Sequence, residues 1–246
     1  MRSSRRRRSG GGLWPLSKGT EQRILCYVTD ASALSAAPTD AASETNYAEN
    51  LVERASLALR AGVNWVQVRD KNLSARMLQV STVDIRLIAQ EVGARVIVND
   101  RLDVAVAAQA GGVHLGRESL PVKEVASWRA KEKPSKPVLQ DFLIGASCHS
   151  LEEARAAALD GADYLIFGPV FETPSKMKFG APLGIEKLRA VCAETRIPVL
   201  AIGGIDLSNA GRCFEAGAAG IAAIRLFQDA KSDLELRERV EQLRVL

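Results

Sequence analysis

The chain is poor in the residues from which metal clusters, disulfide frameworks and membrane spans are built. Its 246 residues include two histidines and four cysteines, with no CxxC pair and no His/Cys spacing typical of a zinc site. We expect Cys26, Cys148, Cys192 and Cys213 to be free thiols in a reducing cytoplasm. No run of about 18 apolar residues occurs, so we expect no membrane-spanning helix. The arginine-rich start is not followed by an apolar segment, which argues against a secretory signal.

Positive charge is concentrated at the start of the chain. The formal net charge is +4, but the first 18 residues hold six basic and no acidic side chains. Subtracting those six leaves −2 for the rest, which lacks the basic excess of a nucleic-acid-binding domain. We predict that residues 1–22 are a disordered Arg-rich extension or follow from a misassigned start codon, with an organelle transit peptide as the alternative. Residues 23–246 then form one folded domain.

Short apolar runs alternate with amphipathic stretches from about residue 24 onward. The runs are nearly continuous in hydrophobicity, which is typical of parallel strands buried on both sides. We predict eight strands, at Ile24–Thr29, Trp65–Arg69, Val96–Asn99, Gly112–Leu115, Leu143–Ala146, Tyr164–Phe167, Val199–Ile202 and Gly220–Ile224.

Helical segments separate these runs, and several carry end signals. Tyr47–Ala61 and Leu207–Ala216 are each followed by glycine, Ser74–Val92 begins with a capping serine, and Ser150–Ala158 opens with a capping-box pattern. Eight such β/α units without a long linker favour a single (β/α)8 TIM barrel over an open doubly wound sheet. The active site of such a barrel lies at the C-terminal ends of the strands.

Polar residues follow the second strand at that end. Alternation places Gln67, Arg69 and Lys71 on one side, where two cations and an amide suit an anionic cluster such as a diphosphate. An ordinary ion-paired strand end is the alternative. Asp100, after the third strand, suits Mg²⁺, which prefers carboxylates together with substrate phosphates, or else it caps the next helix.

The fourth and fifth strands end in hydroxyl and imidazole groups. His114 is either an acid/base group or a packed, hydrogen-bonded histidine. Cys148 and His149 are neighbours on a strand and point to opposite faces, so they do not predict a catalytic dyad. Ser147 fits better as a hydroxyl donor to phosphate.

The last three strands lead into loops that suit a second anion. The loop after the sixth strand contains Thr173, Ser175 and Lys176 between Pro/Gly-rich ends, as in a phosphate-touching lid, although a plain polar loop is the alternative. Gly203 and Gly204 follow the seventh strand and Arg225 follows the eighth, where many barrels form a phosphate cup. Two anion sites facing each other indicate a transferase more than a hydrolase.

Six short motifs, in order and at barrel spacing, resemble those of the thiamine phosphate synthase family, whose close relative is the thiazole tautomerase group. The likeness spans about residues 24–230. The motifs are Gln-Val-Arg-Asp-Lys (67–71), Val-Asn-Asp-Arg (98–101), Gly-Val-His-Leu-Gly (112–116), Gly-Ala-Ser-Cys-His-Ser (145–150), Phe-Gly-Pro-Val-Phe-Glu-Thr-Pro-Ser-Lys (167–176) and Ala-Ile-Gly-Gly-Ile (201–205).

The resemblance implies a reaction and a role for each matching residue. The family joins hydroxymethylpyrimidine diphosphate to a thiazole phosphate and releases diphosphate, with Mg²⁺ and without a protein nucleophile. The implied catalytic residues are Arg69, Lys71, Ser147 and Lys176, and Asp100 matches the first magnesium ligand. The implied substrate contacts are Gln67, Arg69, Lys71, Asn99, Ser147 and Lys176 for the pyrimidine diphosphate, and Thr173, Pro174, Ser175, Gly203, Gly204, Ile224 and Arg225 for the thiazole phosphate.

Two positions depart from the family pattern. Ser119 stands where the family usually has an Asp that serves as second magnesium ligand. Ser119 would be a poorer, neutral ligand at this position, and Glu118 or water is the alternative. Arg225 stands where a Ser is usual, and it either clamps the thiazole phosphate or fills the cup. The alternatives are a thiazole tautomerase, which typically carries a His where Pro169 stands, and a non-catalytic regulator that binds thiamine phosphates. We leave open a homo-oligomer.

Overall fold

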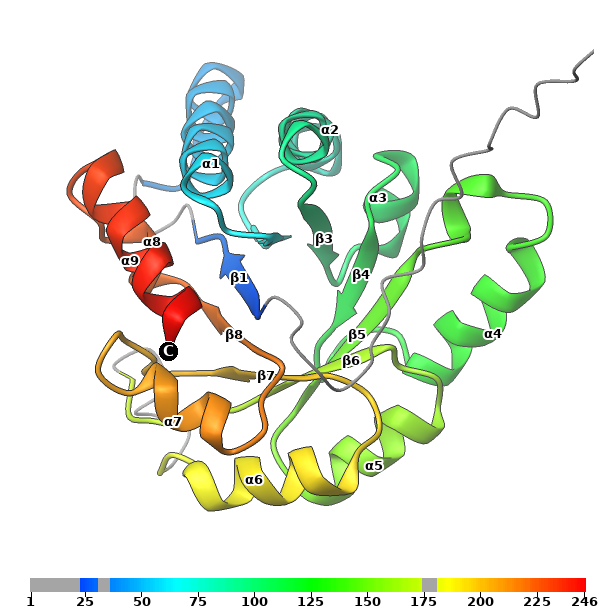
Figure 1. The fold of residues 1–246 in the computed structure, drawn as a ribbon. Coiled ribbons are helices and arrows are strands. Elements are labelled where there is room, and N and C mark those ends of the chain that lie inside the picture. The colour runs from blue at the N-terminus through cyan, green and yellow to red at the C-terminus, as the bar shows by residue number, and fades with distance from the viewer. Residues whose placement is uncertain (1–22, 31–35, 174–180) are drawn as a thin grey trace, which may run out of the picture.

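The computed structural model describes residues 23–30, 36–173 and 181–246. In these parts of the chain, eight parallel strands close into a barrel in sequence order and helices surround it, as Figure 1 shows. The prediction of a single (β/α)8 TIM barrel is confirmed. The predicted Arg-rich extension, residues 1–22, lies outside the described residues.

The strands agree with the predicted runs to within two residues at each end. Strand ends move because the hydrogen-bonded ladder, and not the apolar run, decides where pairing stops. The strands are β1 (Ile24–Val28), β2 (Trp65–Val68), β3 (Arg95–Asn99), β4 (Gly112–Leu115), β5 (Leu143–Cys148), β6 (Tyr164–Phe167), β7 (Val199–Ile202) and β8 (Gly220–Ala223).

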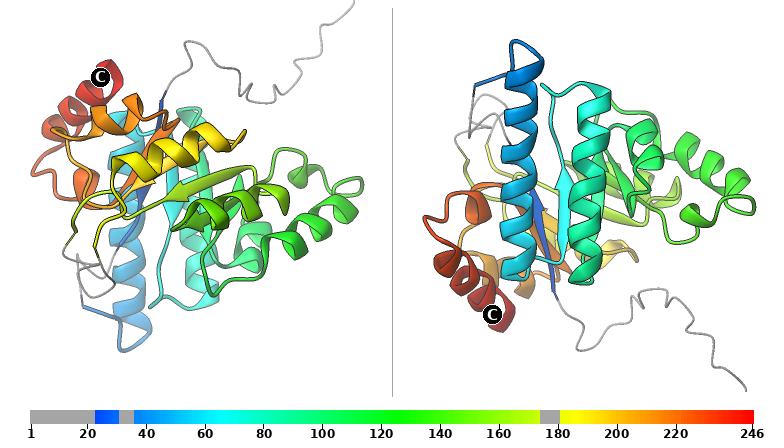
Figure 2. Two further views of the ribbon diagram at one scale, coloured as in Figure 1. Left: turned by 90° about the horizontal axis from the view of Figure 1, so that it is seen from below. Right: turned by 90° about the horizontal axis from the view of Figure 1, so that it is seen from above.

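Helices pack around the outside of the barrel, and Figure 2 shows α1 and α2 side by side along it. In the described parts, they are α1 (Ala41–Ala61), α2 (Ala75–Glu91), α3 (Leu102–Ala107), α4 (Val122–Glu132), α5 (Leu151–Leu159), α6 (Ile185–Glu194), α7 (Ala210–Glu215), α8 (Arg225–Gln228) and α9 (Asp233–Val245), with a 3₁₀ turn, η2 (Pro137–Leu139). None of these helices combines the length and apolarity that crossing a membrane requires.

The ends of two helices show how local sequence sets the boundaries. Gly62 ends α1 in the left-handed conformation, with φ 105°, as its C-cap prediction requires. The same helix begins six residues before the predicted Tyr47. Asp40 caps it, because the Ser43 amide donates to the Asp40 carboxylate at 2.8 Å and the Asp40 amide donates to Ser43 Oγ at 3.0 Å. Ser74 caps α2 as predicted.

Alternating strand residues divide between two apolar regions. Outward-facing side chains join the large core beneath the helices. Inward-facing side chains fill the barrel, where Trp65 and Tyr164 meet edge to face with ring centroids 5.0 Å apart. The barrel is therefore a packed core, and only its open ends can hold a ligand.

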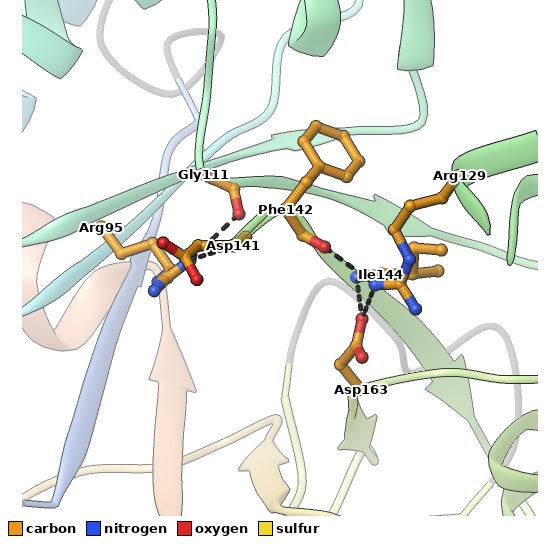
Figure 3. Close-up of polar contacts among 7 residues, drawn as sticks. All are labelled: Arg95, Gly111, Arg129, Asp141, Phe142, Ile144 and Asp163. Atoms are coloured by element: carbon orange, nitrogen blue, oxygen red, sulfur yellow. Dashed lines mark hydrogen bonds and ion pairs between the residues drawn. The ribbon is translucent and has the colours of Figure 1, made fainter. Parts of the chain in front are cut away.

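A polar network ties the strands together at their N-terminal ends (Figure 3). Arg95 donates to the carbonyl oxygens of Gly111 and Asp141 at 3.2 and 2.8 Å. Asp163 pairs with Arg129 and accepts a hydrogen bond from the Ile144 amide at 2.7 Å. These charged groups join neighbouring strands, so this end of the barrel contributes to stability. Ligands are therefore expected at the C-terminal ends of the strands, which we call the mouth.

Candidate active site

A layer of polar side chains crosses the inside of the barrel just below the mouth. It is formed by Gln67, Asn99, His114 and Ser147, which take inward positions on the consecutive strands β2 to β5. The interior positions of β6, β7, β8 and β1 at this level are mainly apolar, among them Ile166. One half of the barrel interior is therefore equipped to bind a polar ligand.

Gln67 and Asn99 form the first pair in this layer. Gln67 is only 4% exposed, and its Nε2 donates to Asn99 Oδ1 at 2.9 Å. The Oε1 atom of Gln67 is buried and receives no hydrogen bond from any described residue. An unpaired buried acceptor is costly, so this atom indicates a ligand that brings an N–H or O–H donor. The structure thus brings together two residues predicted to bind the same substrate.

His114 and Ser147 form the second pair. His114 Nε2 lies 2.8 Å from Ser147 Oγ, and His114 Nδ1 lies 3.2 Å from the hydroxyl of Tyr164. Burial lowers the pKa of His114 to about 3 and raises that of Tyr164 well above its ordinary value, so both groups are neutral near pH 7. Of the two alternatives for His114, the packed and hydrogen-bonded histidine is the one observed.

Arg69 and Lys71 lie beyond the end of β2, with Arg69 half-buried and Lys71 exposed. Neither side chain forms an ion pair or hydrogen bond with any residue that the structure describes. The alternative of an ion-paired strand end is therefore not what the described residues form. Two cations that pair with none of the described residues and follow a buried amide are suited to an anion.

The backbone that carries these cations is held from both sides. Thr29, at the end of β1, accepts from the Arg69 amide at 2.9 Å and donates to the Arg69 carbonyl at 3.0 Å. On the other side, Tyr47 of α1 donates to Asp70 at 2.9 Å and accepts from Asn72 at 3.0 Å. Burial is the main cause that raises the pKa of Tyr47 to about 12, and the hydrogen bond to Asp70 raises it further. The loop is therefore preorganised on the rigid barrel.

Asp100, the predicted magnesium ligand, directly follows β3. Asp100 is exposed in a left-handed conformation, with φ 66°, and its carboxylate accepts no hydrogen bond from a described residue. The alternative that Asp100 caps the following helix is wrong, because the residue before α3 is Arg101 and no side chain caps that helix. A single free carboxylate fits Mg²⁺ that is held jointly with substrate phosphates.

Ser119 has a role within its own loop. Its hydroxyl accepts a hydrogen bond from the Gly116 amide at 2.7 Å, and its amide donates to the Gly116 carbonyl at 3.2 Å. The residue thus closes the turn after β4. Among the described residues, no group of three or more His, Cys, Asp or Glu could hold a metal by itself. Metal binding by Ser119 stays a prediction.

A cleft of about 1070 Å³ occupies the other side of the mouth, at β7 and β8. Its lining includes Thr173, Gly203, Gly204, Ile224 and Arg225, all predicted contacts of one substrate. The amides of Gly204 and Arg225 donate no hydrogen bond to any described residue, so they are free for an anion. Arg225 donates to Thr173 Oγ1 at 3.2 Å across the cleft. The cleft lining does not include Gln67, Arg69, Asp100 or Ser147, which lie on the β2–β5 side.

The glycines of this cleft are required by loop packing. Gly203 has φ 99°, and a Cβ there would lie 2.5 Å from Pro169 Cβ. A Cβ on Gly204 would overlap the carbonyl oxygen of Glu172. Glycine at these two positions therefore lets the backbone after β7 pack closely against the loop after β6, in addition to any close contact with a ligand.

Three predicted substrate contacts, Pro174, Ser175 and Lys176, lie outside the described residues. Cys148 is buried, and burial raises the pKa of its thiol to about 12, while His149 Nδ1 lies 2.5 Å from the Gly168 carbonyl. Nucleophile chemistry by this pair is therefore not supported, as expected from their opposite faces.

The sequence did not single out three residues that support the site, namely Thr29, Tyr47 and Tyr164. Thr29 directly follows a strand, so the strand-end rule used for the other residues could have found it. Tyr47 and Tyr164 are both 2% exposed and look like ordinary apolar positions in the sequence. Their hydroxyl contacts depend on the closed barrel and have no local signal.

The chain is similar to several known proteins. The model of one protein family, described as thiamine monophosphate synthase, matches residues 39–227. A putative thiamine-phosphate synthase of Geobacter sulfurreducens is 42% identical over 189 residues, which cover 77% of this chain and 83% of that relative. A thiamine-phosphate synthase of Chlorobium luteolum is 41% identical over 212 residues, covering 86% and 88%. A solved thiamine phosphate pyrophosphorylase from Pyrococcus furiosus has a TM-score of 0.67 at 34% identity, covering 89% of this chain and 96% of that one.

Proposed function

The chain belongs to the thiamine monophosphate synthase family, and we propose that its mouth joins hydroxymethylpyrimidine diphosphate to a thiazole phosphate, giving thiamine phosphate and diphosphate. The family and the names of the relatives confirm the prediction of a transferase in thiamine biosynthesis. One observation carries the residue-level proposal. Arg69 and Lys71, two cations that no described residue pairs with, follow Gln67 with its buried acceptor, opposite a second anion cleft.

The β2–β5 side binds the pyrimidine diphosphate in this proposal. The free Oε1 of Gln67 accepts a hydrogen bond from the pyrimidine, while Arg69 and Lys71 contact the diphosphate oxygens. Ser147 adds a hydroxyl contact, and Lys176 keeps the role that the family resemblance assigns to it. Asp100 would hold Mg²⁺ together with the diphosphate, and the ion would supply positive charge to the leaving group.

Departure of the diphosphate leaves an electron-rich pyrimidinylmethyl cation, which the thiazole nitrogen captures. The C–O bond to the diphosphate breaks with its electron pair on oxygen, and the new C–N bond forms with the nitrogen lone pair. The protein's part is to orient the partners and to stabilise the developing negative charge through Arg69 and Lys71. No protein nucleophile takes part, in agreement with the burial of Cys148.

The β7–β8 side binds the thiazole phosphate. The amides of Gly204 and Arg225, which donate to no described residue, donate to the phosphate oxygens in this proposal, and the Arg225 guanidinium contacts Thr173 in the same cleft. A guanidinium in place of a serine hydroxyl adds a charge-assisted contact, so Arg225 clamps the phosphate in this proposal. The two anions then face each other across the mouth.

Isomerisation of a thiazole carboxylate phosphate is the second function considered. The tautomerase group typically has a His where this chain has Pro169, and Pro169 lines the cleft. Proline cannot transfer a proton, which favours the transferase. All four cysteines are free, which supports our proposal of a cytoplasmic enzyme.

The test combines the purified protein, both phosphorylated substrates and Mg²⁺, and measures thiamine phosphate. We expect the wild type to form product and to stop forming it when Mg²⁺ is chelated. We expect Arg69→Ala and Lys71→Ala each to lower the rate by at least about a hundredfold, because each removes a charged contact to the leaving group. Lys123→Ala is the matched control, since Lys123 is an exposed cation on α4. Equal rates in all three variants would contradict the assigned roles.

A further inference from the structure

A chain of three polar side chains runs through the barrel interior to the mouth. Tyr164 and His114 are each 2% exposed, and Ser147 is the last inward-facing residue of β5. Tyr164 hydroxyl and His114 Nδ1 are 3.2 Å apart, and His114 Nε2 and Ser147 Oγ are 2.8 Å apart. The chain therefore connects the middle of the barrel with a hydroxyl at the substrate side of the mouth.

The geometry around Tyr164 leaves its hydroxyl little freedom. The ring lies directly over Gly145, where any Cβ would overlap it, and packs edge to face on Trp65. His114 is paired in register with the same Gly145, which puts the imidazole beside the phenol. The contact between Tyr164 and His114 is thus fixed by the packing of three adjacent strands.

Counting hydrogens decides the direction of each hydrogen bond. A neutral imidazole carries one N–H and one acceptor nitrogen. His114 Nδ1 is the one acceptor for the Tyr164 O–H among the described residues, and a fully buried hydroxyl without an acceptor is costly. Nδ1 must therefore accept, which places the histidine proton on Nε2. Nε2–H then donates to Ser147 Oγ, and the Ser147 O–H remains available as a donor.

We propose that Tyr164 and His114 are positioning residues that fix Ser147 as a hydrogen-bond donor toward the pyrimidine diphosphate. In the opposite tautomer, with the proton on Nδ1, the Ser147 hydroxyl would donate to His114 Nε2. Only its oxygen lone pairs would then face the mouth, and they would repel a diphosphate oxygen. The serine thereby complements Arg69 and Lys71 as a donor aimed at an anion. The choice of substrate rests on the proposed function, whereas the tautomer does not.

The first experiment measures the tautomer in the enzyme alone by nitrogen-15 NMR of protein labelled in histidine. The chain has two histidines, so a His149→Gln variant assigns the four ring signals. We expect a protonated Nε2 and an unprotonated Nδ1 for His114 at pH 7. Tyr164→Phe removes the hydroxyl that donates to Nδ1, so we expect the Nδ1 signal of His114 to shift while the proton stays on Nε2. A protonated Nδ1 in the wild type, or no change in Tyr164→Phe, would overturn the proposal.

The second experiment measures kcat and KM of the transferase in variants of the chain. We expect Ser147→Ala and His114→Phe each to lower kcat/KM for the pyrimidine diphosphate on the order of tenfold, and the double variant to lose no more than either one. His114→Gln can keep an N–H near the Nε2 position, so we expect it to recover most of the loss. KM for the thiazole phosphate should stay unchanged.

The outcomes separate this proposal from the proposed function. Additive losses in the double variant, or no recovery in a folded His114→Gln, would overturn the positioning role. A wild type that makes no thiamine phosphate would refute the function, and the tautomer measurement would then decide the hydrogen-bond chain by itself. Tyr164→Phe serves as the variant that keeps the ring and its packing if His114→Phe does not fold.

Discussion

Replacing Thr29 with valine tests how the Arg69 side of the mouth is held. The Thr29 side chain is 0% exposed, and its hydroxyl makes both a donated and an accepted hydrogen bond with the Arg69 backbone, at 3.0 and 2.9 Å. Valine has nearly the same shape but can make neither bond. The substitution therefore leaves the N–H and C=O of Arg69 without these partners while the strand packing is retained.

The expected magnitude follows from the two lost hydrogen bonds. Each contributes about 1 kcal/mol net, so we expect Thr29→Val to lower the free energy of unfolding by about 2 kcal/mol. Thr29→Ser keeps the hydroxyl and loses one buried methyl group, which costs about 1 kcal/mol. A shift of the Arg69 backbone that weakens its contact with the diphosphate by about 1 kcal/mol raises KM for that substrate about fivefold.

Urea denaturation and steady-state kinetics on both variants give the answer. We expect Thr29→Val to raise KM for the pyrimidine diphosphate and leave KM for the thiazole phosphate unchanged, with Thr29→Ser close to the wild type in both. If the two variants have the same KM for the pyrimidine diphosphate, Thr29 does not position Arg69.

Three further predictions concern other parts of the mouth. Arg225→Ser should raise KM for the thiazole phosphate about tenfold and leave KM for the pyrimidine diphosphate unchanged, because it removes one charge-assisted contact. Equal changes in both KM values would refute the proposed contact of Arg225 with the thiazole phosphate. Gly203→Ala should cost about 2 kcal/mol or more in urea denaturation, because φ is 99° and the new Cβ would crowd Pro169. Burial in the folded barrel lowers the pKa of His114 from 6.5 to about 3. Between these two values the unfolded chain carries a proton on His114 that the folded chain lacks. The free energy of unfolding therefore decreases by about 1.4 kcal/mol per pH unit as the pH falls through this range. His114→Gln should show a shallower pH dependence of the unfolding free energy than the wild type, and an identical slope would contradict the shift.

The barrel could be predicted from the sequence because its strands carry a strong local signal. Continuous apolar runs such as Tyr164–Phe167 are buried on both sides and coincide with the observed strands. The start of α1 was placed too late because residues before Tyr47 are small and polar, and their helical state depends on the cap formed by Asp40 and Ser43.

The sequence predicted where the candidate site lies in the barrel, but it predicted few of the side-chain contacts within the site. The family resemblance assigned Gln67 and Asn99 to the same substrate, and the two side chains meet in the structure. The contact of His114 with Tyr164 joins residues 50 positions apart, so it depends on the register of three strands, which no local pattern reports. The turn closed by Ser119 likewise depends on backbone geometry.

In the proposed function, the two sides of the mouth hold two phosphorylated substrates that react with each other. The most direct measurement is the ratio of diphosphate to thiamine phosphate that the wild-type protein forms from both substrates with Mg²⁺. We expect equal amounts of the two products, and no diphosphate when the thiazole phosphate is left out. Release of diphosphate without thiamine phosphate would show a hydrolase and would contradict the proposed transfer reaction.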